Sequence, residues 1–134
     1  MELDETMMVA GIGCRKGVDQ GQVLAAVEAA LATHGLSAAA LSALATAHFK
    51  HAEDAIAATG KTLKLPLLLV DDAALRAVSL RALTRSVPSL QATGTPSISE
   101  TAALAAAGQH ATLLGPRIAV GPVTCAIAVA GDVA

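Results

Sequence analysis

Short apolar runs alternate with segments of helical periodicity along this chain. Apolar runs of strand length cover about residues 7–13, 41–46, 65–70, 111–114 and 123–130. Apolar positions recur with helical spacing over about 20–34 and 51–59, and an alanine-rich stretch follows Ser97. Alternating strands and helices that end in a strand hairpin predict one three-layer α/β/α domain, with a mixed, mostly parallel sheet of about five strands.

The expected helix ends carry the residue types that helix ends favour. Ser97 and Glu100 form a capping-box pattern, in which each side chain bonds to the other residue's backbone N–H. By similar reasoning, helices are expected to begin at Asp19 and at Asp71–Asp72 and to end at Gly35, Gly60 and Gly108. The run 65–70 is continuously apolar, which is typical of a strand buried on both faces.

The composition indicates a protein with a real core that does not cross a membrane. The chain has 134 residues, of which 54% are hydrophobic, but no apolar run approaches the roughly 18 residues that a membrane span requires. Residues 1–6 read as an acidic tail and 7–134 as the domain. The acidic start is the opposite of a signal peptide, so a soluble, cytoplasmic protein is expected, with Cys14 and Cys125 as reduced thiols.

Charge and aromatic content argue against a nucleic-acid partner. The net charge is −2, and outside the first five residues the nine Lys and Arg face eight Asp and Glu. Phe49 is the single aromatic residue, so there is no stacking platform. His48 and His51 are three residues apart, but a solvated helix start explains them better than a metal site does. We expect neither a metal nor a cofactor.

The segment from Gly11 to Gly17 is the first candidate for chemistry. A strand runs into glycines and the adjacent cations Arg15 and Lys16 before a helix, an arrangement that binds anionic ligands in open α/β sheets. The spacing G-x-G-x-x-x-G fits neither the dinucleotide motif nor the P-loop. If the first two strands are parallel, Lys50 joins these cations at one edge of the sheet, and the helix start at 97–100 is expected there too. The alternative is an ordinary solvated rim of cations, a group that also includes Arg76, Arg81, Arg85 and Arg117.

Three further residues have two readings each. Cys14 lies beside cations near a helix start, a setting that activates thiols, but a small packing residue in a tight turn is the better account. Glu100 could face a ligand or only cap its helix, and Glu53 could bind a ligand or pair with Lys50. No nucleophile–base pair is legible.

Several motifs resemble the CobE/CbiG C-terminal family of cobalamin biosynthesis. Gly-Ile-Gly-Cys-Arg-Lys-Gly at 11–17 is similar to the family's opening, and Gly-Thr-Pro-Ser-Ile-Ser-Glu at 94–100 is similar to its turn before an alanine-rich helix. Further similar segments, in the family's order, are 44–53, Leu65-Pro66-Leu67 and 123–128. Together they span about residues 8–129, nearly the whole chain.

The resemblance implies a role in building the corrin ring of vitamin B12. In the fused, oxygen-independent form, such a domain ends a protein that opens a lactone on cobalt-precorrin-5A and releases acetaldehyde. This chain begins just before its glycine motif, so it resembles the free-standing form of the oxygen-dependent route. The implied ligand is a polycarboxylate precorrin or a hydrogenobyrinic-acid-type tetrapyrrole. The expected binding residues are Gly13, Cys14, Arg15, Lys16, Gly17, Lys50, Glu53, Gly94, Ser97 and Glu100.

Three functions are compatible with these features. The chain could be a carrier or accessory protein that binds a corrin intermediate. It could be a hydrolase-like enzyme acting on a precorrin lactone, or a structural partner of other corrin-pathway enzymes. The lack of a legible catalytic pair favours the carrier.

Overall fold

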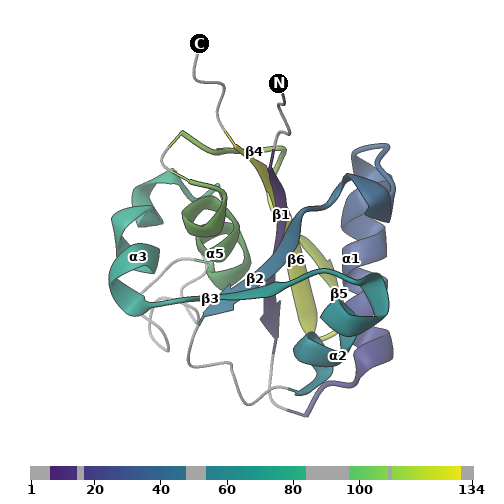
Figure 1. The fold of residues 1–134 in the computed structure, drawn as a ribbon. Helices are drawn as coiled ribbons and strands as arrows, with labels where there is room; N and C mark the ends of the chain where they lie inside the picture. Colours follow the sequence, from purple (N-terminus) through teal and green to yellow (C-terminus); the bar gives the residue numbers. More distant parts are fainter. Residues whose placement is uncertain (1–6, 15–16, 48–53, 84–96, 109, 131–134) are drawn as a thin grey trace.

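A mixed sheet with helices on both faces forms the centre of the molecule (Figure 1). The computed structural model describes residues 7–14, 17–47, 54–83, 97–108 and 110–130. The sheet has six strands in the order β3-β2-β1-β6-β4, and β5 pairs with β6. The strands are β1 (Met8–Cys14), β2 (Ala43–Ala47), β3 (Leu67–Val70), β4 (Thr112–Leu113), β5 (Ile118–Val120) and β6 (Val123–Val129).

The predicted α/β class with a mixed sheet is confirmed, but the balance within the sheet differs from the expectation. Only the pairings β1–β2 and β2–β3 are parallel, whereas β6 pairs antiparallel with β1, β4 and β5. The sheet is therefore not mostly parallel. The sixth strand, β5, lies within the expected hairpin connection at 115–122, where Gly121 makes the tight turn into β6 with a φ of 58°.

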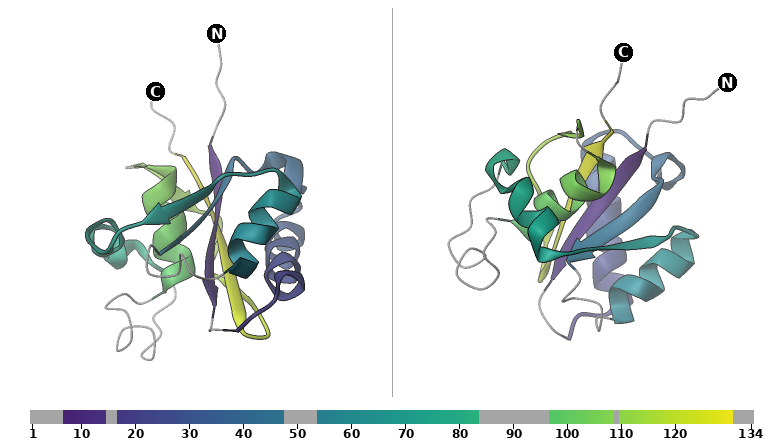
Figure 2. Two further views of the ribbon diagram at one scale, coloured as in Figure 1. Left: turned by 60° about the horizontal axis from the view of Figure 1, so that its bottom comes forward. Right: turned by 60° about the vertical axis from the view of Figure 1, so that its left-hand side comes forward.

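The helices form one layer on each face of the sheet (Figure 2). Helices α1 (Gln20–Thr33) and α2 (Asp54–Leu63) cover one face. Helices α3 (Asp72–Ala77) and α5 (Ile98–Ala107) cover the other. Two short 3₁₀ turns complete the described elements, η1 (Ala38–Ala40) and η3 (Ser79–Arg81). No helix among the described residues is both long enough and apolar enough to cross a bilayer.

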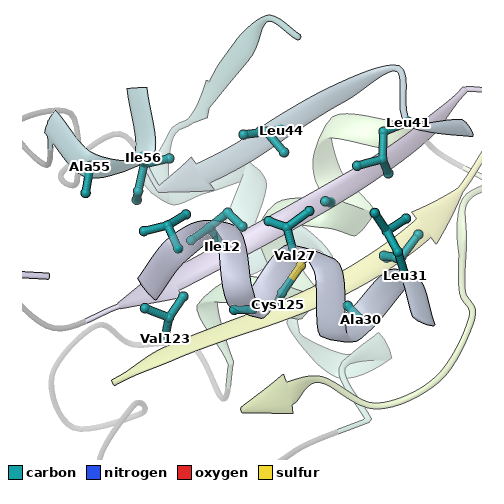
Figure 3. Close-up of a cluster of buried hydrophobic side chains, with 14 residues drawn as sticks. Ile12, Val27, Ala30, Leu31, Leu41, Leu44, Ala55, Ile56, Val123 and Cys125 are labelled. Atoms are coloured by element: carbon teal, nitrogen blue, oxygen red, sulfur yellow. The ribbon is translucent and has the colours of Figure 1, made fainter. Parts of the chain in front are cut away.

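Each helical layer encloses its own apolar core. Figure 3 shows the core beneath α1, where Ile12, Val27 and Cys125 interdigitate between the helix and the sheet. On the other face, Val9 and Ala45 meet the alanine-rich side of α5. Side chains alternate between the two faces of β1, so this strand contributes to both cores. Burial of one large aliphatic side chain stabilises the fold by about 1.5–3 kcal/mol.

Most of the predicted helix ends are confirmed. Asp19 caps α1 in a capping box with Gln22, and Asp71 caps α3 by accepting from the Ala74 N–H. Gly35 follows α1 with a φ of 67°, and Gly108 ends α5 with a φ of 113°. The prediction for Gly60 is wrong, because α2 continues through it to Leu63.

The end of α2 is made without glycine. Lys64 takes the left-handed conformation there, with a φ of 60°. Gly60 instead lies at a tight contact, because a β-carbon on it would lie 3.1 Å from the Leu65 carbonyl oxygen, which would have to shift slightly.

The prediction of a strand buried on both faces is wrong for β3, which lies at an edge of the sheet and whose leucines are only partly buried or exposed. Leu69 is 48% exposed, and only Val70 of this strand is fully buried. An apolar run has the same sequence pattern at an edge as at the centre, and only the neighbouring strands distinguish the two positions.

Helix α5 packs directly against the backbone of β1 at Gly11. A β-carbon placed on Gly11 would lie 2.0 Å from the Ser99 carbonyl oxygen and 2.7 Å from the Ala103 nitrogen. These neighbours are backbone atoms, which cannot move aside as a flexible side chain would. Gly11 and Gly13 therefore belong to the strand, and at Gly11 the missing side chain lets α5 rest on β1. The strand expected at about 7–13 therefore runs through both glycines and ends at Cys14.

We predict that Gly11→Ala destabilises the protein by about 3 kcal/mol or more, because the methyl group must displace the α5 backbone. Gly21→Ala is the matched control, since this position lies in α1 and its nearest neighbour is Asp19 Oδ1 at 3.4 Å. It should stabilise by up to about 1 kcal/mol through helix propensity. Urea unfolding measures both changes, and equal stability of the two variants would contradict the close contact.

Candidate functional site

The strands β1, β2 and β3 run parallel, so they end at the same edge of the sheet, which we call the carboxyl edge. Their last residues are Cys14, Ala47 and Val70. Helix α5 begins at this edge as well, because the Ser99 nitrogen lies 3.5 Å from the β-carbon position of Gly13. The shared edge expected for the first two strand ends and the start at Ser97 is therefore present.

Two threonine hydroxyls hold the last carbonyl groups of β1. Thr46 Oγ1 in β2 donates to the Ile12 carbonyl at 2.8 Å, and Thr124 Oγ1 in β6 donates to the Gly13 carbonyl at 3.3 Å. The ladder between β1 and β2 reaches only Gly11, so a side chain replaces the next backbone donor. These threonines were not predicted as site residues. The available signal was a hydroxyl residue within an otherwise apolar strand.

The first turn of α5 is polar and fully buried. Ser97, Ser99, Glu100 and Thr101 each expose 0% of their surface. Ser97 Oγ accepts from the Glu100 N–H at 3.5 Å and lies 3.4 Å from Ser99 Oγ, while Thr101 Oγ1 donates to the Ser97 carbonyl at 2.7 Å. The predicted N-cap at Ser97 is thus confirmed, and its hydroxyl is turned toward the helix it caps.

The carboxylate of Glu100 connects α5 to the chain just before β5. Its Oε2 accepts from the Arg117 backbone N–H at 2.8 Å, across 17 residues of sequence. Glu100 was expected either to face a ligand or to cap its helix. In the structure its carboxylate has a structural role, because it bonds to a distant part of the chain. No local pattern announces this bond, because the donor is a backbone group that any residue could provide.

The two thiols differ in burial. Cys125 lies opposite Ile12 in the β1–β6 ladder and is completely buried, and this burial raises the pKa of its thiol to about 12. Cys14 is half-buried at the end of β1, and its side chain lies on the same face as Cys125, toward α1. Neither cysteine forms a disulfide in the described structure, which agrees with the expected thiols.

Half of the predicted binding residues fall within the described parts of the chain. Gly13 is buried, and Thr124 Oγ1 lies 2.8 Å from its β-carbon position. Gly17 is exposed in the turn between β1 and α1, with a φ of 84°. Together with Cys14, Ser97 and Glu100, these residues lie at or beside the carboxyl edge. Arg15, Lys16, Lys50, Glu53 and Gly94 lie outside the described residues, as do His48, His51 and Arg85.

Two further cations lie in or just after α3. Arg76 is exposed in the last turn of α3, and Arg81 donates to the Ala111 carbonyl. The described residues contain no cluster of three or more His, Cys, Asp or Glu side chains that could hold a metal ion.

We predict that Glu100→Ala destabilises the protein by about 1.5–3 kcal/mol, because the Arg117 N–H loses a charged acceptor. Glu100→Gln keeps an acceptor oxygen and should lose less. Urea unfolding distinguishes the two variants. If Glu100→Ala left stability unchanged, the structural role would be refuted.

A second prediction concerns Cys125, whose raised pKa keeps the thiol protonated in the folded state. A thiol reagent at mildly alkaline pH should modify Cys125 only after unfolding, with the site located by mass spectrometry. This thiol favours folding below its ordinary pKa of 9.0, and that contribution is lost as the pH rises toward 12. Rapid labelling of native Cys125 would contradict its burial.

Comparisons of the sequence and of the structure with known proteins both find relatives in cobalamin biosynthesis. Residues 8–128 match the family model described as cobalamin synthesis G C-terminus. Protein CobE from Sinorhizobium sp is 31% identical over 121 residues, which cover 90% of this chain and 79% of the relative.

Two solved structures are similar over nearly the whole chain. The crystal structure of CobE, a protein from the cobalamin (vitamin B12) biosynthetic pathway, has a TM-score of 0.89 and 33% identity, and covers 96% of this chain and 94% of its own. The cobalamin biosynthesis protein chiG from Agrobacterium tumefaciens has a TM-score of 0.75 and 46% identity, covering 94% of this chain and 100% of its own. The chain therefore belongs to the cobalamin synthesis G C-terminal family, a family of cobalamin biosynthesis proteins.

Proposed function

We propose that the protein binds a polycarboxylate precorrin or hydrogenobyrinic-acid-type corrin non-covalently at the carboxyl edge. In this role it serves the oxygen-dependent pathway as a carrier or accessory protein. The observation that carries the proposal is the start of α5, which is held against the end of β1 at Gly13. The proposal agrees with the pathway named for the similar CobE structure.

The backbone supplies part of the expected attraction for carboxylates. The helices α1 and α5 both begin at the carboxyl edge, and helix N-termini carry partial positive charge. Precorrins carry many acetate and propionate groups, so several weak anion sites along one edge suit such a ligand better than a single deep pocket.

The side chains supply the rest of the proposed attraction. Arg15 and Lys16 directly follow Cys14, the last residue of β1, and Lys50 follows Ala47, the last residue of β2, by three positions. Because these cations follow two neighbouring strand ends closely in sequence, the proposal assigns them to one ligand. Glu53, Gly94 and Ser97 complete the proposed set by sequence position, with Ser97 acting through the helix start that it caps.

Ultraviolet–visible titration of the pure protein with hydrogenobyrinic acid tests this function. The variant Lys16→Ala/Lys50→Ala should bind at least tenfold more weakly and with a shallower salt dependence, because a lost charge-assisted hydrogen bond costs about 1.5–3 kcal/mol. Lys61→Ala/Lys64→Ala is the matched control. These lysines lie in the last turn of α2 and just after it, near the amino ends of the parallel strands and away from the carboxyl edge. Their replacement should therefore leave the affinity unchanged.

Circular dichroism must show that both variants fold. Equal affinity of the two double variants would remove Lys16 and Lys50 from the site. Release of a new tetrapyrrole by the wild-type protein alone, when it is supplied with a precorrin lactone, would replace the carrier by the hydrolase.

A further inference from the structure

We infer that Thr46 and Thr124 are positioning residues for the proposed corrin site, because their hydroxyls fix the point where the chain leaves β1. The inference rests on the function proposed above and concerns how that site is held in place. Arg15 and Lys16, which the proposed function assigns to the ligand, directly follow this point in the sequence.

The last part of β1 pairs with a neighbouring backbone on one side only. The ladder with β6 continues to Cys14, whereas the ladder with β2 ends at Gly11. Thr46 Oγ1 donates to the Ile12 carbonyl at 2.8 Å, and Thr46 is completely buried. This hydroxyl therefore supplies the hydrogen bond to β2 at a point where the two backbones no longer pair.

The second hydroxyl acts on the next carbonyl of β1. Thr124 lies opposite Gly13 in the antiparallel ladder, and its Oγ1 donates to the Gly13 carbonyl at 3.3 Å. A β-carbon on Gly13 would lie 2.8 Å from this oxygen and 3.5 Å from the Ser99 nitrogen. The glycine thus leaves the room that the hydroxyl needs, beside the first turn of α5.

The two hydroxyls hold β1 from opposite faces of the sheet. Leu44 belongs to the core beneath α1, so Thr46, two positions later in β2, lies on the same face. Thr124 lies on the other face, because its hydroxyl covers Gly13 beside α5. Two successive carbonyls are therefore held from two strands and two faces. We call Thr46 and Thr124 the threonine clamp.

The threonine clamp also connects three parts of the proposed site. Thr46 ties the end of β1 to β2, the strand that Lys50 follows in sequence, and Thr124 ties the end of β1 to β6 beside the start of α5. A ligand that contacts several segments binds tightly only when their relative positions are fixed beforehand. When one segment moves away part of the time, the apparent affinity falls by the fraction of molecules that remain competent.

Hydrogen exchange of the ligand-free full chain, followed by mass spectrometry, tests the clamp itself. Thr46→Val and Thr124→Val keep the shape of the side chain but remove the hydroxyl. Each should speed exchange of the backbone amides at 13–17 about fivefold, the change in an equilibrium that loss of one typical hydrogen bond causes. Thr46→Ser and Thr124→Ser keep the donor and should exchange as the wild type does. Unchanged exchange in both valine variants would overturn the inference.

Ultraviolet–visible titration with hydrogenobyrinic acid tests the role of the clamp in binding. Each valine variant should bind about fivefold more weakly, and each serine variant should bind as the wild type does. Thr59→Val is the matched control, because Thr59 is equally buried and its Oγ1 donates to the Ala55 carbonyl at 2.8 Å within α2. This control removes a hydrogen bond of the same length from the fold but not from the site, so stability should fall while affinity stays the same.

The outcomes separate the clamp from the function on which it rests. Equal weakening of binding by Thr59→Val would show a general effect of stability and would overturn the positioning role. Failure of the wild-type protein to bind would refute the proposed function, and the exchange data alone would then decide whether the hydroxyls hold the end of β1. Circular dichroism must show that each variant folds. Thr124 is only half-buried, so its variants keep the test decisive if those of Thr46 do not fold.

Discussion

The contact between the backbone of α5 and the glycines of β1 is the constraint on which the rest of this structure depends. At Gly11 the space that a β-carbon would need is filled by the Ser99 carbonyl and the Ala103 nitrogen. A helix that packs at side-chain distance could slide or tilt, but a backbone contact permits one position. It sets the height of α5 along β1 and thereby brings Ser97 to the carboxyl edge.

The polar interior of the α5 start follows from this position. A helix that is pressed against the sheet buries its first turn, and buried polar groups must be paired within the protein. Ser97 and Thr101 pair within the turn, while the Glu100 carboxylate reaches the Arg117 backbone before β5. The contact at Gly11 thus places the start of α5 beside the proposed corrin site. The Glu100–Arg117 bond then connects the segment before β5 to that helix.

The two outer sides of the sheet differ: β3 forms one side, and the short strands β4 and β5 form the other. On one side the β4–β5 segment contains a proline and makes only short pairings. On the other side β3 is a single strand between α2 and α3, and its leucines have apolar neighbours on both faces but no outer partner strand in the described structure.

Local signals in the sequence determined the order of elements and most helix ends. Asp19, Asp71 and Ser97 cap their helices through bonds that span only three residues, so the residue types alone predict them. The glycine motif also marked the right place, since β1 ends there and α5 begins beside it. Its physical meaning was predicted only in part, because glycine is required equally by a tight turn and by a close approach of two backbones.

Tertiary structure alone decided the features that depend on distant segments. The edge position of β3, the direction of β6 and the bond from Glu100 to Arg117 all require knowledge of which strand lies next to which. A run of leucines has the same pattern at an edge as at the centre, and a backbone N–H has no sequence signature. Short-range capping can therefore be predicted from residue types, whereas strand neighbours arise from the packing of the whole sheet.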